Sequence, residues 1–183
     1  MSTTSLLPFK LDLLKRLVEV GELSYKENVR IASVLDDKAQ RTSTIAGIFL
    51  AAGFAALKPE TLATLSGPVL VVLLSVAVAL LILSVGASLL AMWARTNAPP
   101  LSVEDISSMT RDVLVLPDVR ITADLEARTY LDQGRIWSSC VAAQDEVNAK
   151  KARLLRFAQI TVALAIATIG LFLGVLLKRA FFK

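Results

Sequence analysis

The residues best suited to acid–base chemistry are three pairs of adjacent carboxylates: Asp36-Asp37, Glu104-Asp105 and Asp145-Glu146. Neighbouring residues on a helix point about 100° apart, so the two carboxyl groups of a pair do not converge on one substrate. The chain has no histidine, the commonest general base and zinc ligand, and its single cysteine, Cys140, cannot build a zinc site alone. We therefore predict no catalytic residue, no metal site and no cofactor, and we interpret the acidic pairs as solvated helix surface.

The composition of the chain is strongly apolar and indicates which helices carry these residues. Hydrophobic residues make up 55% of the chain and the mean hydropathy is +0.62, against roughly 45–50% apolar residues in soluble domains. Three stretches contain no charged residue: 42–57, 61–94 and 157–177. An uncharged, mostly apolar run of about 18 residues or more is typical of a membrane span. We predict an all-α integral membrane protein with about three transmembrane helices, an amphipathic N-terminal helix, and a long cytoplasmic helix continuous with the last span.

The first uncharged stretch, residues 42–57, is short for a span. Its 16 residues reach ~24 Å as a helix, against a hydrocarbon core of ~30 Å. Flanking basic side chains can snorkel to close part of the gap, so we expect this stretch to cross, with a re-entrant helix as the alternative. The second stretch is long enough, and we expect Ser66 as its N-cap, Pro68 in the first turn, and a helix that runs to about Arg95.

Two segments outside these stretches have helical periodicity. In the first, the apolar row is Leu7, Leu11, Leu14, Val18, Gly21, Tyr25, Val29, Ala32 and Leu35. Acidic and basic residues nearly balance on its opposite face, which favours packing on a partner helix over lying on a membrane surface. In the second, a row steps 4-3-4-3-4 as in a coiled coil: Ile136, Cys140, Ala143, Val147, Lys150 and Leu154. Between Thr122 and the last uncharged stretch, Gly134 is the only helix breaker, so we expect one unbroken helix into the last span.

Basic residues are concentrated in residues 1–41 and 95–156, which hold 16 of the 20 lysines and arginines. The positive-inside rule therefore places both segments, and the N-terminus, in the cytoplasm. The expected parts are a cytoplasmic amphipathic helix (1–41), a transmembrane hairpin (42–95), a cytoplasmic helical segment (96–156), and the last transmembrane helix with its tail (157–183). The net charge of +4 fits basic residues that flank spans in the lipid bilayer. Because no basic run is interleaved with aromatics, we expect no nucleic-acid partner.

Small residues recur at four-residue spacing in all three stretches, which lets helix backbones approach closely in lipid. The positions are Gly170 and Gly174 of a GxxxG motif in the last stretch, Gly47, Ala51 and Ala55 in the first, and Ser84 and Ser88 in the second. We predict that they are helix-packing and oligomerisation positions of a homo-oligomer. No ionisable residue lies within any stretch, which counts against ion-coupled transport.

Short motifs precede the first and last stretches. Their residues are Asp36, Lys38 and Ala39 in an Asp-x-Lys-Ala pattern, and Lys151, Leu155 and Arg156 in a pattern of Lys followed by Leu-Arg. With these motifs and this layout, the chain resembles the small transmembrane effectors of bacterial anti-phage systems, namely the Pycsar transmembrane effector family and the related SLATT group. It departs from them at Ala152, where an aromatic residue commonly follows the lysine.

The resemblance implies an effector that stays silent until infection, then oligomerises in the bacterial inner membrane and breaks its integrity. Its trigger would be a nucleotide second messenger or a soluble partner protein. The absence of a recognisable nucleotide-binding domain favours a partner or an oligomer-interface site. The main alternative is a non-toxic membrane anchor or adaptor that docks a soluble partner through its cytoplasmic helices. A membrane enzyme is a third interpretation.

Overall fold

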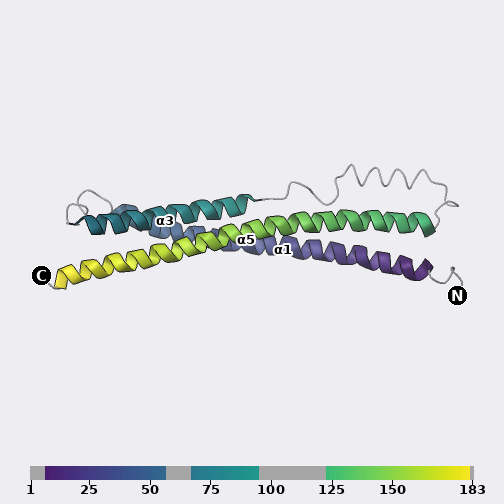
Figure 1. The fold of residues 1–183 in the computed structure, drawn as a ribbon, viewed down its shortest axis with the longest axis horizontal. Helices are drawn as coiled ribbons and strands as arrows, with labels where there is room; N and C mark the ends of the chain where they lie inside the picture. The colour runs from purple at the N-terminus through teal and green to yellow at the C-terminus, as the bar shows by residue number, and fades with distance from the viewer. Residues whose placement is uncertain (1–6, 57–66, 95–122, 182–183) are drawn as a thin grey trace. The chain divides into compact units, whose positions relative to one another are not determined.

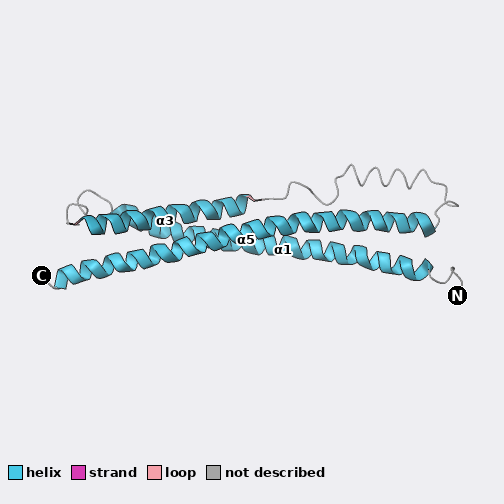
Figure 2. Ribbon diagram, viewed as in Figure 1, coloured by secondary structure: helices cyan, strands magenta, loops and turns pink. Residues whose placement is uncertain are grey.

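The computed structural model describes residues 7–56, 67–94 and 123–181 of the chain. These residues form three helices and no strand (Figure 1, Figure 2): α1 Leu7–Ala56, α3 Pro68–Trp93 and α5 Ala123–Phe181. The prediction of an all-helical protein is thus confirmed for this part of the chain. The acidic pair Glu104-Asp105 lies outside the described residues.

Helices α1 and α5 are long, with 50 and 59 residues. Pro8 lies in the first turn of α1, where a missing N–H removes no helical hydrogen bond, and α5 contains no proline. As the lack of a breaker predicts, α5 joins residues 123–156 and the uncharged stretch 157–177 in a single helix. Helix α1 likewise passes without a break from its amphipathic part into residues 42–56.

Helix α3 begins with a glycine N-cap. Gly67 has φ 156° and ψ 133°, a backbone conformation that residues with a side chain rarely adopt. Pro68 follows in the first turn, as predicted. The prediction of Ser66 as N-cap is wrong, because the residue with cap geometry is Gly67; Ser66 itself lies outside the described residues. The helix ends at Trp93, which is largely exposed.

The described helices divide into two units, each with its own internal contacts. The two-helix unit comprises α1 up to Ala32 and α5 up to Asn148. The three-helix unit comprises α1 from Ser33, all of α3, and α5 from Ala149. The long helices α1 and α5 therefore contribute their N-terminal parts to one unit and their C-terminal parts to the other.

In the two-helix unit α1 and α5 run parallel. Tyr25 of α1 packs on Trp137 of α5, with ring centroids 5.7 Å apart and ring planes tilted by 52°. Further along both helices, Asn28 of α1 accepts a hydrogen bond from Asn148 of α5. Because the residue numbers in contact rise together on the two helices, the helices point in the same direction.

Most positions of the predicted helix faces are half-buried on both α1 and α5. The α1 positions that are half-buried as predicted are Leu11, Leu14, Val18, Gly21, Tyr25, Ala32 and Leu35. At one position the α1 prediction is wrong, because Val29 is exposed and Asn28 is half-buried in its place. On α5 the predicted positions Ile136, Cys140, Val147 and Leu154 are half-buried. The prediction is wrong at Ala143 and Lys150, which are exposed, whereas their neighbours Gln144 and Lys151 are buried. The α5 seam therefore contains polar side chains that an apolar search passes over.

Gly21 of α1 lies close to the side chain of Trp137 of α5 in the two-helix unit. A Cβ atom added there would lie 2.9 Å from the Cβ of Trp137, whereas one added at Gly134 of α5 would meet no described atom within 4 Å.

Replacing either of these glycines, Gly21 or Gly134, by alanine gains about 1 kcal/mol of helix propensity. We expect Gly134→Ala to raise the unfolding temperature. We expect Gly21→Ala to lower it, because overpacking costs about 1–3 kcal/mol. Thermal unfolding followed by circular dichroism checks this, and equal gains for both variants would contradict it.

In the three-helix unit α3 runs antiparallel to α1 and α5. The buried clusters are Ala39, Ala91 and Leu155; then Ala46, Leu81, Val162 and Ala165; then Leu70, Leu74 and Phe172. From one cluster to the next, the residue numbers of α5 increase while those of α3 decrease, so these two helices run in opposite directions. The residue numbers of α1 increase with those of α5 over the first two clusters, so α1 and α5 run in the same direction. Alanine is frequent among these buried residues, so the helix backbones lie close together.

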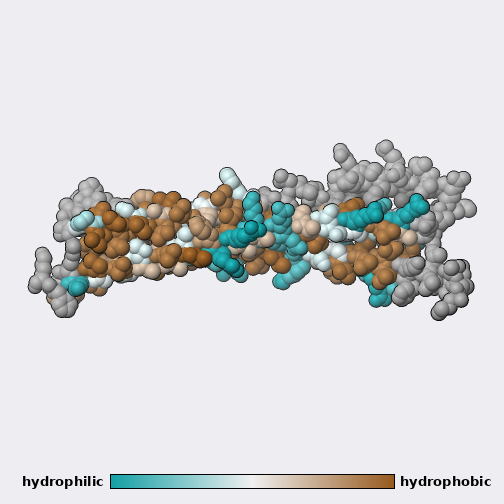
Figure 3. All heavy atoms as spheres, viewed as in Figure 1, coloured by the Kyte–Doolittle hydropathy of each residue, from teal (hydrophilic) through white to brown (hydrophobic). Residues whose placement is uncertain are grey.

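Two of the described helices are long and apolar enough to cross a membrane: α3, Pro68–Trp93, and the part of α5 between Leu125 and Lys178. Their outward faces carry large apolar side chains that are about half exposed, among them Val72, Ile82, Leu83, Leu90, Ile160, Leu164 and Leu171. In Figure 3 the visible face of the three-helix unit is covered largely by apolar side chains. These features support the prediction of a membrane protein, because soluble monomers rarely expose apolar surfaces of this extent.

Candidate functional site

Two of the predicted packing positions, Ser84 and Ser88, lie inside the three-helix unit. Both residues are fully buried. Ser84 Oγ donates a hydrogen bond to the carbonyl oxygen of Ala158 at 2.9 Å, which joins α3 to α5. Ser88 Oγ has no hydrogen-bond partner within the described residues. Both serines let α3 pack closely, and Ser84 alone of the two bonds to another helix.

This difference between the two serines can be measured. Ser84→Ala is expected to destabilise the protein by about 0.6–1.7 kcal/mol, the range of interhelical hydrogen bonds in membranes. Ser88→Ala is expected to be neutral or slightly stabilising, because it removes a buried hydroxyl that lacks a partner. Each variant removes one oxygen atom from a buried position of the same helix, so each is the control for the other. Unfolding in mild detergent measures both, and equal losses would contradict the assignment.

The other predicted packing positions lie on the outside of the three-helix unit. Ala51, Ala55, Gly170 and Gly174 are exposed and Gly47 is half-buried. A Cβ atom added at Gly47, Gly170 or Gly174 would meet no described atom within 4 Å. These small residues therefore do not mediate packing among the described helices of one chain.

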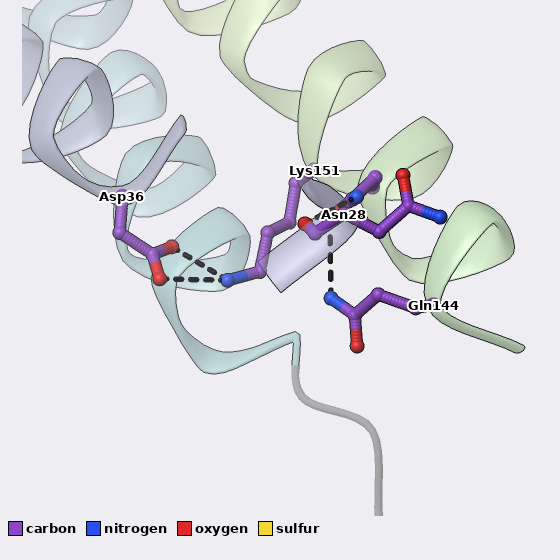
Figure 4. Close-up of polar contacts among 5 residues, drawn as sticks. Asn28, Asp36, Gln144 and Lys151 are labelled. Atoms are coloured by element: carbon purple, nitrogen blue, oxygen red, sulfur yellow. Dashed lines mark hydrogen bonds and ion pairs between the residues drawn. The ribbon is translucent and has the colours of Figure 1, made fainter. Parts of the chain in front are cut away.

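Two residues of each short motif lie where α1 and α5 meet in the three-helix unit. The Lys151 ammonium donates to both carboxylate oxygens of Asp36, at 2.7 and 2.8 Å (Figure 4). One turn further along each helix, Ala39 and Leu155 belong to the same buried cluster. The remaining motif residues, Lys38 and Arg156, are exposed. The three residues of each motif therefore have different roles. Asp36 and Lys151 form an ion pair, and Ala39 and Leu155 are buried in one cluster. Lys38 and Arg156 lie on the surface.

The Asp36–Lys151 ion pair has unequal burial. The Lys151 side chain is 5% exposed and the Asp36 side chain is 40% exposed. Lys151 is the one charged residue that is buried among the residues that the structure describes. A buried ammonium loses most of its hydration, so it depends on its carboxylate partner far more than the half-exposed carboxylate depends on it. Asp37, next to Asp36, is exposed, as expected for adjacent residues on a helix.

Polar side chains also occupy the helix contact of the two-helix unit. Asn148 Nδ2 donates to the carbonyl oxygen of Asn28 at 2.9 Å, and Asn28 Nδ2 donates to Asp145 Oδ1 at 2.8 Å. Gln144, labelled in Figure 4, donates through Nε2 to Asn148 Oδ1 at 3.3 Å. In coiled coils a buried polar residue of this kind fixes the register of the helices at some cost in stability. Sequence reasoning missed Gln144 and Asn148, although four-three spacing counted back from Leu155 leads to both.

Other titratable groups of the described residues lie on the surface or apart from one another. Arg30 and Glu27 form an exposed ion pair at 2.8 Å in the two-helix unit; the hydrogen bond from Arg30 lowers the pKa of Glu27 and raises the pKa of Arg30. Exposed pairs of this kind contribute little to stability. Cys140 is half-buried. Within the described ranges, no three acidic or thiol side chains gather as metal ligands would.

Comparisons of this chain with protein-family models, with curated proteins and with solved structures found no match.

Proposed function

We propose that this protein is an oligomerising membrane effector that crosses the bacterial inner membrane three times and compromises it when triggered. The observation that carries the proposal is the pair of outward small-residue faces on α1 and α5. Gly47, Gly170 and Gly174 have open space where a side chain would be, while serines and alanines already fill the interior of the same unit. In lipid, small residues on an outer face favour close approach of a second helix.

Three spans are supported by how α1 packs on the two helices that are long enough to cross. Ala46 of α1 shares a buried cluster with Leu81 of α3, and Gly53 of α1 lies against Val78 of α3. A helix that packs along a spanning helix at successive levels shares its depth in the bilayer. Residues 42–56 therefore form the remaining span in this proposal, in preference to a re-entrant helix.

The orientation in this proposal follows from charge. Most basic residues lie in residues 1–41 and 95–156, which places the N-terminus and the two-helix unit in the cytoplasm. The parallel course of α1 and α5 in each unit is compatible with this topology, because α3 returns the chain across the membrane between them. The Asp36–Lys151 ion pair then lies at the cytoplasmic end of the three-helix unit and holds α1 against α5 in the resting protein.

The anti-phage role rests on the resemblance of the two motifs to small transmembrane effectors. The ion pair of Asp36 with Lys151 and the buried cluster that Ala39 and Leu155 share add a physical reason for those residue types to occur together. In this setting the trigger is a nucleotide second messenger or a soluble partner protein that acts on the cytoplasmic helices. Chemistry on a substrate has no part in the mechanism.

The proposal is tested by expressing the full chain from an inducible promoter in bacteria and following membrane potential with a voltage-sensitive dye. High expression favours oligomerisation by mass action, so we expect loss of potential and arrest of growth on induction. Co-expression with a nucleotide cyclase or with candidate partner proteins tests the triggered state. An intact potential under all of these conditions would overturn the proposal.

An adaptor function is the second candidate, and a groove in the two-helix unit favours it. The groove, of about 820 Å³, is lined by residues of α1 and α5 that include Leu14, Leu17, Val20, Tyr130 and Leu131. A groove with apolar residues on two helices suits the apolar face of a partner helix. The adaptor interpretation predicts harmless expression and a co-purifying soluble protein, whereas the effector interpretation predicts toxicity of the chain alone.

A further inference from the structure

We propose that the three-helix unit binds an acyl chain of a membrane lipid in a cavity between its helices. The cavity has a volume of about 270 Å³ and every residue that lines it is apolar. All three helices contribute: Phe49 and Gly53 from α1, Leu74, Ala77 and Leu81 from α3, and Phe172 from α5. The inference depends on the three-helix unit lying in the bilayer and does not depend on membrane disruption.

The chemistry of the lining selects a hydrocarbon occupant. None of the lining side chains carries a hydrogen-bond donor or acceptor, and an ordered buried water needs two to four polar partners. An empty apolar void deprives its lining atoms of dispersion contacts. A cavity of roughly 150 Å³ already accepts a benzene molecule in a protein core, so this larger one has room for a segment of an alkyl chain.

The position of the cavity indicates which hydrocarbon molecule can enter it. Ala52 and Leu173, which also line it, are exposed on the outer face of the unit, so the cavity reaches the surface that faces lipid. Neighbouring residues on α3 and α5 belong to the two helices that are long and apolar enough to cross a membrane. Acyl chains are the medium at that depth, and they are present at a concentration that no other apolar ligand approaches.

The test uses the full chain reconstituted in phosphatidylcholine vesicles that contain a phospholipid with a diazirine in one acyl chain. After irradiation, mass spectrometry locates the adducts. We expect adducts on buried lining residues such as Leu74 and Phe172, in addition to exposed positions such as Leu83. Ala77→Phe fills the cavity and Ala52→Trp blocks its opening from an exposed position, so both variants are expected to lose the adducts on the buried residues.

Ala79→Phe is the matched control, because Ala79 is an exposed residue of α3 that does not line the cavity. It is expected to keep the wild-type adducts. Ala52→Trp changes an exposed residue and is therefore expected to fold normally. It tests the inference even if Ala77→Phe disturbs folding. Adducts confined to exposed residues in the wild type would overturn the inference. Buried adducts together with an intact membrane potential would uphold the cavity and overturn the effector function.

Discussion

Asp36→Ala is expected to destabilise the three-helix unit by about 3 kcal/mol, towards the lower end of the range for breaking a buried ion pair. The substitution leaves the Lys151 ammonium, whose side chain is 5% exposed, without the carboxylate that lies 2.7 Å away. Partial exposure of Asp36 lets water approach the pair and keeps the loss below the upper end of that range. The reverse substitution is expected to be milder: Lys151→Met removes the buried charge, keeps a similar volume, and leaves Asp36 open to water.

The double variant Asp36→Ala/Lys151→Met separates charge from packing. Replacing a buried ion pair by apolar residues is often neutral or stabilising, so the double variant is expected to regain most of the stability that Asp36→Ala loses. Unfolding of the purified chain in mixed detergent micelles measures all three variants. Under the effector proposal, Asp36→Ala is also expected to lower the membrane potential of cells at expression levels at which the wild type is silent. Equal stability of Asp36→Ala and the wild type would show that the ion pair does not hold α1 against α5.

The helices of this protein could be predicted from apolar periodicity and the placement of proline, but the register of their contacts could not. Counting apolar residues selected Ala143 and Val29, whereas the buried or half-buried positions are Gln144 and Asn28. The physical reason is that side chains bonded to one another across a helix contact can be buried despite their polarity. A row that carries glutamine, asparagine and lysine resembles a solvated face until its partners are known.

Sequence could name the small residues of the spans but could not say which side of a helix they occupy. Ser84 and Ser88 turn out to lie inside the three-helix unit, and Gly170 and Gly174 on its outer face. In a soluble protein the polar face of a helix would decide this question. A span has apolar residues all round, because lipid and the protein interior are both apolar. The pairing of Asp36 with Lys151, 115 residues apart in the chain, likewise required the helix contacts.

Under the effector proposal, Gly170→Leu combined with Gly174→Leu is expected to abolish membrane depolarisation while leaving the fold of the single chain intact. An added Cβ at either glycine meets no described atom within 4 Å, and each replacement gains about 1 kcal/mol of helix propensity. Between two chains the effect is reversed, because leucine side chains keep apart the backbones that a GxxxG motif brings into contact. We expect the association constant to fall on the order of 100-fold, which corresponds to about 3 kcal/mol.

Gly86→Leu is the control that isolates the interface. Gly86 is a glycine of α3 whose added Cβ also meets no described atom within 4 Å. The variant therefore has the same gain in helix propensity per replaced glycine, on a helix without the GxxxG motif. We expect it to depolarise cells as the wild type does and to migrate with the same oligomer size after crosslinking in the membrane. Depolarisation by the Gly170→Leu/Gly174→Leu variant at wild-type strength would assign the two glycines to the lipid-facing surface. The hydrophobic effect does not drive helices together in lipid, because lipid tails are as apolar as the side chains. An outer face of small residues therefore contributes to function only if a second chain packs closely against it.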